Sequence, residues 1–372
     1  MNSEDTPPLG PSSRFAAAYR VLEEAIAARA FPGCAFGVLA GGEIVITDAL
    51  GRFTYDETAP AVTPETVYDI ASITKVASTT AAAMLLHQRG LLDLNTPLGD
   101  LLPGFVAGRA AADPSRHVKL CHLLAHNSGL PAYVEFFRTA ATPEALISAC
   151  LELPLEAEPG ARVEYSDPGF ILLGKALEAV TREPLATWAQ REIFQPLGMA
   201  ATAFCPPPAA RASIPPTEED TTLRHRCIQG PIQGLVQDEN ARLLGGAASH
   251  AGLFSNVPDL LRFAREILSA AVNAPDARLF NAATVELFAR RQPPPGSSRA
   301  LGWDTPSDNS SAGRHFSPHS IGHLGFSGCS LWIDLDAGIA IALLTNRTWP
   351  NRLSQLIRQV RPAFHDAVRE AL

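Results

Sequence analysis

Two short strand patterns near opposite ends of the chain limit most strongly what this sequence can fold into. Residues 34–47 are rich in β-forming residues and are interrupted by Gly41-Gly42, a two-residue turn typical of a β-hairpin. Residues 330–344 repeat this arrangement around the turn Asp336-Ala337. Because the sequence between the two patterns is mainly helical, we expect one antiparallel sheet assembled from both chain ends.

Helical patterns accompany these strands. Apolar residues at helical spacing predict one helix over residues 12–30 and another over about 351–371. An inserted segment begins near residue 66 and includes predicted helices over 74–89 and 166–182. The expected fold class is therefore α/β in the α+β sense, with terminal helices flanking the sheet and a mainly helical inserted lobe.

A single domain with two lobes is expected for the 372 residues. The sheet lobe would comprise residues 1–65 and about 291–372, and the helical lobe about 66–290 with its loops. Two long Pro-rich connections, 205–245 and 291–321, interrupt these lobes. Connections of that length in a compact protein often form the rim of a binding site.

Charge and composition narrow the class of protein. A formal charge of -8 without a Lys/Arg cluster argues against a nucleic-acid partner. No uncharged apolar run reaches about 18 residues, so no membrane span is expected. Residues 1–15 are acidic and turn-forming where a secretory signal would be basic and then apolar, which predicts a cytoplasmic protein. The six cysteines lack a C-x-x-C pair and are expected to be free thiols.

Ser72-Ile-Thr-Lys75 is the most informative short motif. Its spacing of three places both polar side chains on one helix face, within hydrogen-bonding reach. A serine hydroxyl needs a base to become a nucleophile, and a lysine buried near a helix N-terminus loses affinity for its own proton and can serve. Alone, the pattern more often marks an ordinary helix-start serine and a solvated lysine, so it needs support elsewhere in the chain.

Two further stretches supply that support. Tyr165-Ser166-Asp167 stands at a loop-to-helix junction, where a phenol beside a cationic lysine could exchange protons with it. Residues 322–328 crowd glycines into an expected edge strand before the last hairpin, which lets a ligand or another backbone approach closely.

In this order and at these separations, the motifs resemble those of the penicillin-recognising serine hydrolases. That family includes the class C β-lactamases, the D,D-peptidases and the family VIII-type esterases built on the same fold. The three motifs read Ser72–Lys75, Tyr165–Asp167 and His323–Gly325 here. Further similar stretches cover nearly the whole chain: 123–130, 193–199, 245–255 and 325–328.

The resemblance implies an acyl-enzyme mechanism without a cofactor or a metal. Ser72 would attack a carbonyl, and Lys75 and Tyr165 would move its proton, with the choice of base between them left open. The backbone N–H groups of Ser72 and Phe326 would hold the oxyanion. Water would then release the acid.

The substrate-binding positions depart from the β-lactamase pattern. His323 stands where β-lactamases keep a lysine for the substrate carboxylate, and histidine is only partly charged near pH 7, so such anchoring should be weak and pH-dependent. Asp167 stands where they carry an asparagine amide, and a carboxylate cannot donate a hydrogen bond to a substrate carbonyl. Gly325 and Ser327 complete the expected substrate-binding set.

We therefore expect a serine hydrolase of a small ester or amide, of carboxylesterase or peptidase type. The alternative is a β-lactamase or D,D-carboxypeptidase, and a more distant one is a non-catalytic binding protein on the same fold. The presence of Ser72, Lys75 and Tyr165 argues against a non-catalytic protein, because burying a lysine that has no functional contact costs several kcal/mol of desolvation free energy. The expected partner is a small ester, amide or β-lactam. The oligomeric state is not predicted.

The remaining polar candidates have simpler interpretations. His117, His122 and His126 lie close enough in sequence to suggest zinc, but no carboxylate or cysteine completes a site and core histidines are common. We interpret His250 as a structural histidine that holds its turn-rich loop, with a place in the catalytic site as the alternative. Residues 238–240 read as a solvated loop that could also give the cleft acidic character.

Overall fold

The computed structural model describes residues 14–219 and 230–372. The expectation of a cytoplasmic protein is based on residues 1–15, which lie largely outside the described residues. Cys227 also lies outside them. The other five cysteines are free thiols, as predicted. Among the described residues, no helix is both long enough and apolar enough to cross a membrane.

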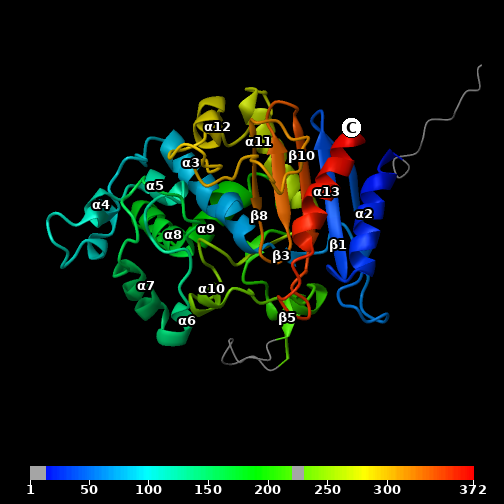
Figure 1. Ribbon diagram of the computed structural model, residues 1–372, viewed down its shortest axis with the longest axis horizontal. Coiled ribbons are helices and arrows are strands. Elements are labelled where there is room, and N and C mark those ends of the chain that lie inside the picture. The colour runs from blue at the N-terminus through cyan, green and yellow to red at the C-terminus, as the bar shows by residue number, and fades with distance from the viewer. Residues whose placement is uncertain (1–13, 220–229) are drawn as a thin grey trace, which may run out of the picture.

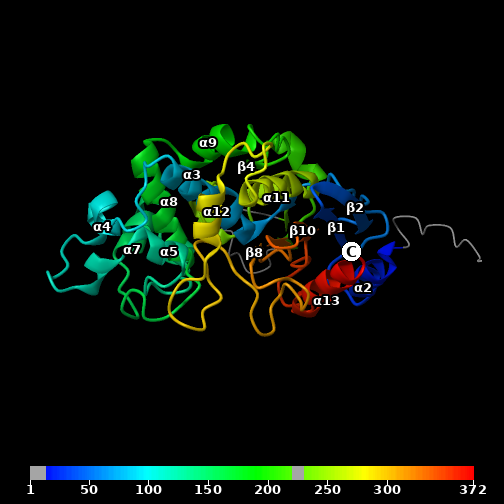
Figure 2. The same ribbon diagram turned by 90° about the horizontal axis from the view of Figure 1, so that it is seen from above.

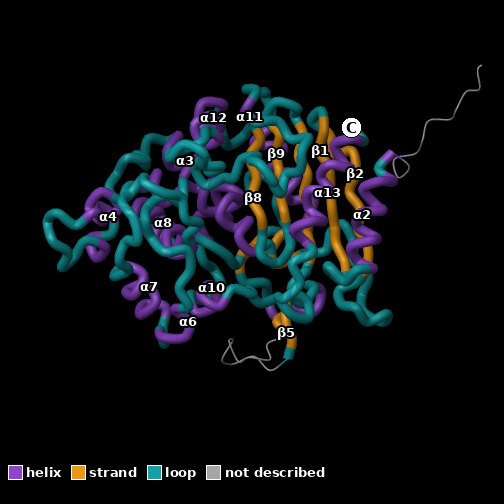
Figure 3. The backbone as a smooth tube through the Cα atoms, in the orientation of Figure 1, coloured by secondary structure: helices purple, strands orange, loops and turns teal. Residues whose placement is uncertain are grey.

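Strands from both ends of the chain form one five-stranded antiparallel sheet, as the two hairpins predicted (Figure 3). Its order is β2-β1-β10-β9-β8. The central pairing joins the two ends, with Cys34 opposite Thr345 and Ala40 opposite Ile339. The strands are β1 (Gly33–Ala40), β2 (Glu43–Gly51), β8 (Ser320–Leu324), β9 (Ser330–Asp334) and β10 (Ile339–Thr345).

The terminal helices α2 (Ala16–Ala27) and α13 (Ile357–Glu370) lie side by side on one face of the sheet (Figure 1). Phe36 of β1 packs edge-on against a ring from each helix, with 5.4 Å between ring centroids in both pairs. The last helix begins later than the predicted residue 351. Residues 351–356 remain a loop, and the Arg347 guanidinium binds two of its carbonyl groups.

Helix α11 (Val257–Ala271) covers the opposite face of the sheet (Figure 2). The approach is close, because a Cβ atom added to Gly37 of β1 would lie 2.5 Å from Val257 Cγ1. With both faces covered, β1 is apolar nearly throughout, rather than alternating. The proposed lobe boundaries near residues 65 and 291 remain a prediction.

The helical part surrounds a buried central helix that is less regular than the single helix predicted over 74–89. It begins with a 3-10 turn (Ala71–Ile73), continues as a π-helical stretch (Lys75–Thr80) and ends as α3 (Ala81–Gln88). Such π-helical segments often occur at functional sites. The helix predicted over 166–182 is confirmed as α8 (Asp167–Thr181), capped by the Ser166 hydroxyl, which accepts a hydrogen bond from the Gly169 N–H.

Shorter elements complete the fold. The remaining helices are α4 (Leu98–Leu101), α5 (Leu120–Leu124), α6 (Phe136–Thr139), α7 (Pro143–Leu151), α9 (Leu185–Ala189), α10 (Glu239–Leu243) and α12 (Ala282–Ala289). Further 3-10 or π turns span Pro103–Phe105, Pro114–His117, Gln190–Phe194 and Pro208–Ser213. Small sheets pair β3 (Tyr68–Asp69) and β4 (Ala203–Phe204) with β7 (Leu253–Ser255), and β5 (Glu218–Glu219) with β6 (Pro231–Ile232).

The start of β1 yields a stability prediction. A Cβ atom on Gly33 would lie 2.5 Å from the Arg52 carbonyl oxygen, and backbone there cannot move aside cheaply. We expect Gly33→Ala to lower the free energy of unfolding by about 2–3 kcal/mol in denaturant titrations. Gly41→Ala is the control: its methyl group would meet nothing within 4 Å, so only the strain of its positive φ remains, about 1 kcal/mol. Equal losses in the two variants would contradict this reading of the β1 start.

Candidate active site

Ser72 lies on a strained turn between β3 and the central helix. The residue before it, Ala71, has a φ of 47°, a left-handed conformation that costs a non-glycine residue about 1–2 kcal/mol. The buried Asp69 carboxylate stabilises the turn by accepting hydrogen bonds from the N–H groups of Ala71 (2.9 Å) and Gln237 (2.8 Å). Burial raises the pKa of Asp69 to about 6. Asp69 therefore stabilises this turn and orients the serine.

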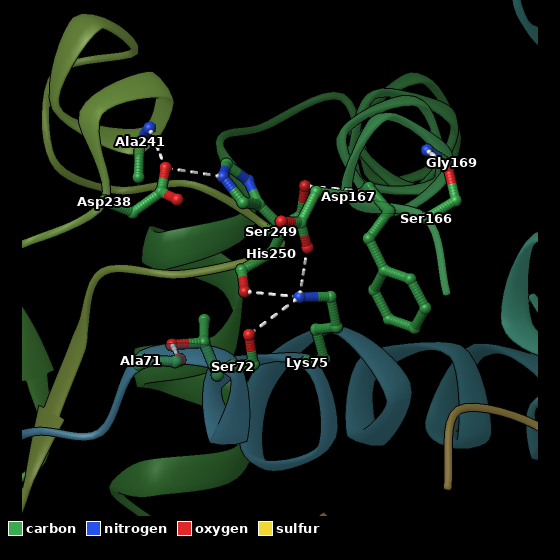
Figure 4. A network of polar contacts seen from close by, with 12 residues as sticks. Ala71, Ser72, Lys75, Ser166, Asp167, Gly169, Asp238, Ala241, Ser249 and His250 are labelled. Atoms are coloured by element: carbon green, nitrogen blue, oxygen red, sulfur yellow. Dashed lines mark hydrogen bonds and ion pairs between the residues drawn. The ribbon is translucent and has the colours of Figure 1, made fainter. Parts of the chain in front are cut away.

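Lys75 lies one helical turn beyond Ser72 and is fully buried. Its ammonium nitrogen is 3.1 Å from Ser72 Oγ, 3.0 Å from the His250 carbonyl oxygen and 2.7 Å from Asp167 Oδ1 (Figure 4). Burial lowers the pKa of Lys75, but the charge of Asp167 and the Tyr165 phenol outweigh it, so the net pKa is raised. The resting lysine is an ammonium, unlike the proton-poor lysine expected from the sequence, because Asp167 pairs with it.

Tyr165 meets Ser72 and Lys75 from the loop before α8. Its ring centroid is 4.8 Å from Lys75 Nζ. Burial raises the pKa of Tyr165, and the charge of Lys75 together with hydrogen bonds to Lys75 and Ser72 only partly offsets this, so the resting group is a phenol. The structure thus brings together the three predicted catalytic side chains.

His126, which the sequence analysis treated as a core histidine, holds Tyr165 in place. Its carbonyl oxygen accepts the Glu164 N–H (2.8 Å) and its Nδ1 accepts the Ser166 N–H (2.9 Å), so the two bonds bracket the tyrosine. Its ring lies 4.5 Å from the Tyr165 ring, and burial holds its pKa well below the usual value. Within the described ranges, no group of three His, Cys, Asp or Glu side chains could hold a metal ion.

His323 lies on the edge strand β8 and is almost completely buried. Its Nδ1 lies 2.9 Å from the Leu324 carbonyl oxygen, a contact that requires a proton on Nδ1. Burial and the nearby cations Lys75 and Arg299 hold the pKa of His323 well below its usual value. The imidazole is therefore neutral near pH 7, not partly charged as expected from the sequence.

The loop after β8 is attached to the segment that carries the nucleophile. Ser327 Oγ donates to the Asp69 carbonyl oxygen (2.7 Å), and a Cβ atom on Gly325 would lie 2.5 Å from the Ile70 carbonyl oxygen. Ser327 is fully buried and its hydroxyl is used in this contact, so its side chain does not line the cavity, and its predicted role in substrate binding stays a prediction. Phe326 projects outward and is about half exposed.

A cavity of about 610 Å³ opens over these groups. Its wall includes three of the four predicted substrate-binding positions, Asp167, His323 and Gly325. The predicted catalytic residues Ser72 and Tyr165 and the predicted oxyanion position Phe326 also border it. Both long connections contribute to it, as predicted for the rim of a site, through Gln237–Glu239 and through Arg299 and Asp304. The sequence analysis missed Arg299, whose guanidinium carbon lies 5.2 Å from the centroid of the Tyr165 ring, and Tyr133. Neither residue lies in a recognisable motif.

His250 has a structural contact that holds its loop and also a contact with the predicted catalytic lysine. Its carbonyl oxygen binds Lys75, and its Nε2 lies 2.9 Å from Asp238 Oδ1. Although burial acts to raise the pKa of Asp238, its interaction with His250 lowers it to about 2. The solvated loop expected at 238–240 is wrong, because Glu239 and Asn240 are buried in the first turn of α10.

The ion pair at Lys75 predicts a change in pH dependence. In Asp167→Asn the carboxylate charge is lost while burial still acts on Lys75, so the pKa of the lysine should fall. We expect the rising limb of kcat/KM against pH to move to lower pH by about one unit or more. A profile from pH 5 to pH 10 on a short-chain ester measures this, and an unmoved limb would contradict the electrostatic role of Asp167.

The same substitution should destabilise the fold by about 1–3 kcal/mol in denaturant titrations at neutral pH. Because the folded pKa of Lys75 is raised, its contribution is complete below the unfolded lysine pKa of about 10.4 and is lost as pH rises through the folded value. Lys175→Gln, which removes a partly exposed pair with Glu178, is the matched control and should cost less than about 1 kcal/mol.

The neutral His323 predicts that carboxylate binding is insensitive to pH. The Kd of a penicillin for a non-reacting Ser72→Ala variant should stay constant between about pH 5.5 and 7.5. His323→Lys should lower that Kd several-fold, because a fixed cation would face the carboxylate. If the Kd of the Ser72→Ala variant, with His323 retained, instead rises steadily with pH through this range, then the histidine is charged at low pH and the prediction is wrong.

Comparisons with known proteins agree with this architecture. The family model Beta-lactamase matches residues 19–361. An N-acetylmuramyl-L-alanine amidase of Bacillus subtilis (strain 168) is 30% identical over an alignment 361 residues long, which covers 88% of this chain and 80% of that protein. A protein of Escherichia coli (strain K12), provisionally named a D-alanyl-D-alanine carboxypeptidase, is 31% identical over 77% of this chain and 70% of its own length.

A solved structure shows the same fold. It belongs to EstCE1, described as a hydrolase with promiscuous acyltransferase activity. It is 22% identical in sequence, has a TM-score of 0.77 and covers 96% of this chain and 99% of its own. Together with the match of the family model over most of the chain, these relatives establish that the protein is a member of the β-lactamase family.

Proposed function

We propose that this chain hydrolyses a small ester or amide through an acyl intermediate on Ser72. The observation that carries the proposal is the fully buried Lys75 ammonium, which contacts Ser72 Oγ at 3.1 Å beside the Tyr165 phenol. A buried lysine costs several kcal/mol to desolvate, and here its position is used to hold the hydroxyl at the wall of a cavity.

The proposed reaction has two balanced steps. In the reactive form the Lys75–Tyr165 pair has first lost one proton to solvent, and Ser72 Oγ then bonds to the substrate carbonyl carbon while its own proton enters that pair. The carbonyl oxygen becomes an oxyanion that the N–H groups of Ser72 and Phe326 receive, and the leaving group departs with a proton from the same pair. Water then repeats the sequence on the acyl-serine and releases the acid, which restores Ser72.

The neutral His323 favours substrates that carry no carboxylate at this position. A histidine without charge offers a substrate carboxylate no ionic partner, whereas an uncharged ester or amide loses nothing by its absence. We therefore favour carboxylesterase or peptidase-like activity. The named amidase among the relatives acts on an amide bond, which fits the same chemistry.

A β-lactamase or D,D-carboxypeptidase is the second candidate, and Arg299 is the observation that favours it. Its guanidinium borders the cavity beside Tyr165, and its nearest carboxylate, Asp304, is 3.9 Å away. It could therefore bind a substrate carboxylate in place of the family's lysine.

Turnover of p-nitrophenyl butyrate tests the nucleophile. Ser72→Ala should lower kcat by about 10³-fold or more with the fold intact, because no other group can form the acyl intermediate. The control is Ser78→Ala, a buried serine farther along the same helix, which should retain activity. Wild-type turnover by Ser72→Ala would refute the assignment.

Substrate preference separates the two candidates. We expect the wild-type protein to have a higher kcat/KM for p-nitrophenyl butyrate than for nitrocefin, because no lysine anchors the nitrocefin carboxylate. A marked preference for nitrocefin that disappears in Arg299→Gln would instead establish the second candidate. Failure of a fluorophosphonate and of a penicillin to label the protein would support a non-catalytic binding protein.

A further inference from the structure

Two arginines that border the cavity also bind the loop that carries Phe326. We call residues 325–329, which join β8 to β9, the oxyanion loop. Arg347 and Arg361 are each about 6% exposed, and neither has a carboxylate within 4.0 Å among residues 14–219 and 230–372. Unpaired buried cations are expensive, so their contacts should account for their presence.

Arg361, from α13, binds three carbonyl groups of the oxyanion loop. Its Nη2 donates to the Gly325 oxygen at 2.7 Å and to the Cys329 oxygen at 2.9 Å, and its Nε donates to the Gly328 oxygen at 3.1 Å. Charge-assisted hydrogen bonds of this kind are about twice as strong as neutral ones. One side chain therefore fixes most of the backbone of the loop.

The bond to Gly325 acts directly on the peptide unit that holds the Phe326 N–H. That peptide is trans and planar, so its N–H points opposite to the Gly325 carbonyl. A guanidinium on the oxygen draws electron density toward itself and makes the N–H at the other end a better donor. The Gly328 N–H also donates to the Gly325 oxygen (3.0 Å), which further fixes the plane.

Arg347 supports the following peptide in the same manner. Its Nε donates to the Phe326 oxygen (2.8 Å), its backbone N–H donates to the Ser327 oxygen (2.8 Å), and its guanidinium carbon lies 4.5 Å from the centre of the Phe326 ring. Burial lowers the pKa of both arginines to about 10, so both remain cations at neutral pH.

We propose that Arg361 is a positioning residue for the reaction: its guanidinium orients and polarises the Gly325–Phe326 peptide so that the Phe326 N–H stabilises the oxyanion. The proposal rests on the proposed function, in which Ser72 forms an acyl intermediate and the Phe326 N–H donates a hydrogen bond to its carbonyl oxygen. A purely structural role would hold the turn together without affecting the acyl carbonyl.

Infrared difference spectroscopy of the acyl-enzyme separates the two roles. The probe is a slowly deacylating p-nitrophenyl ester with a ¹³C-labelled carbonyl, mixed with stoichiometric protein, and its carbonyl stretch reports the hydrogen bonding of the acyl oxygen. In Arg361→Met the band should shift to higher wavenumber, and kcat should fall about 10-fold or more while KM changes less than about two-fold. Arg361→Lys keeps the charge but loses the forked arrangement of donors. Its band position and its kcat should therefore lie between those of the wild type and of Arg361→Met.

Arg20→Met is the matched control. Arg20 lies on α2, which packs beside α13, is exposed, does not line the cavity and makes no hydrogen bond to the oxyanion loop among the described residues, so the band and kcat should stay as in the wild type. A folded Arg361→Met variant with an unshifted band and unchanged kcat overturns the inference. If that variant does not fold, an unshifted band in Arg361→Lys overturns it. If the wild-type protein forms no adduct on Ser72, it is the proposed function that fails.

Discussion

The buried ammonium of Lys75 is the constraint on which the rest of the site depends. A cation taken fully out of water must find compensating partners, and Lys75 finds them in three separate parts of the chain: Ser72, the first residue of α8 and the carbonyl of His250. Meeting the electrostatic needs of one side chain therefore joins the central helix, α8 and the loop before β7. The same contacts that make the lysine tolerable in the interior place the serine hydroxyl beside it, so the stability and the geometry of the site have one origin.

The sheet contributes the other half of the site. Strand β8 is at its edge, and the turn that follows is attached to the segment before Ser72 by the Ser327 hydroxyl and by the close approach of Gly325 to Ile70. Glycine is needed there because any side chain would collide with the Ile70 carbonyl. Arg361 then reaches the same turn from α13. The site thus forms where an edge strand built from the C-terminal part of the chain meets a helix that begins near residue 71.

Local chemistry explains what could be predicted from the sequence. The Gly41-Gly42 turn and the apolar runs around it specify a hairpin without reference to distant residues, and the Ser72–Lys75 spacing specifies one helix face. What could not be predicted depends on contacts between distant segments. The protonation of Lys75 is set by Asp167, which the sequence placed only near substrate, and the role of His126 appears only when its ring is seen against Tyr165. The burial of Ser327 and the binding of the oxyanion loop by two arginines could not be predicted for the same reason, because burial and contacts between distant segments are not local properties.

The most direct test of this account is to locate the acyl group. The protein would be mixed with a slowly deacylating ester, quenched in acid, digested and sequenced by mass spectrometry. The account predicts a single acyl modification on Ser72, formed at a rate that falls sharply when Lys75 is replaced by methionine. A modification on any other residue, or one that forms on Ser72 equally fast without the Lys75 amine, would contradict it.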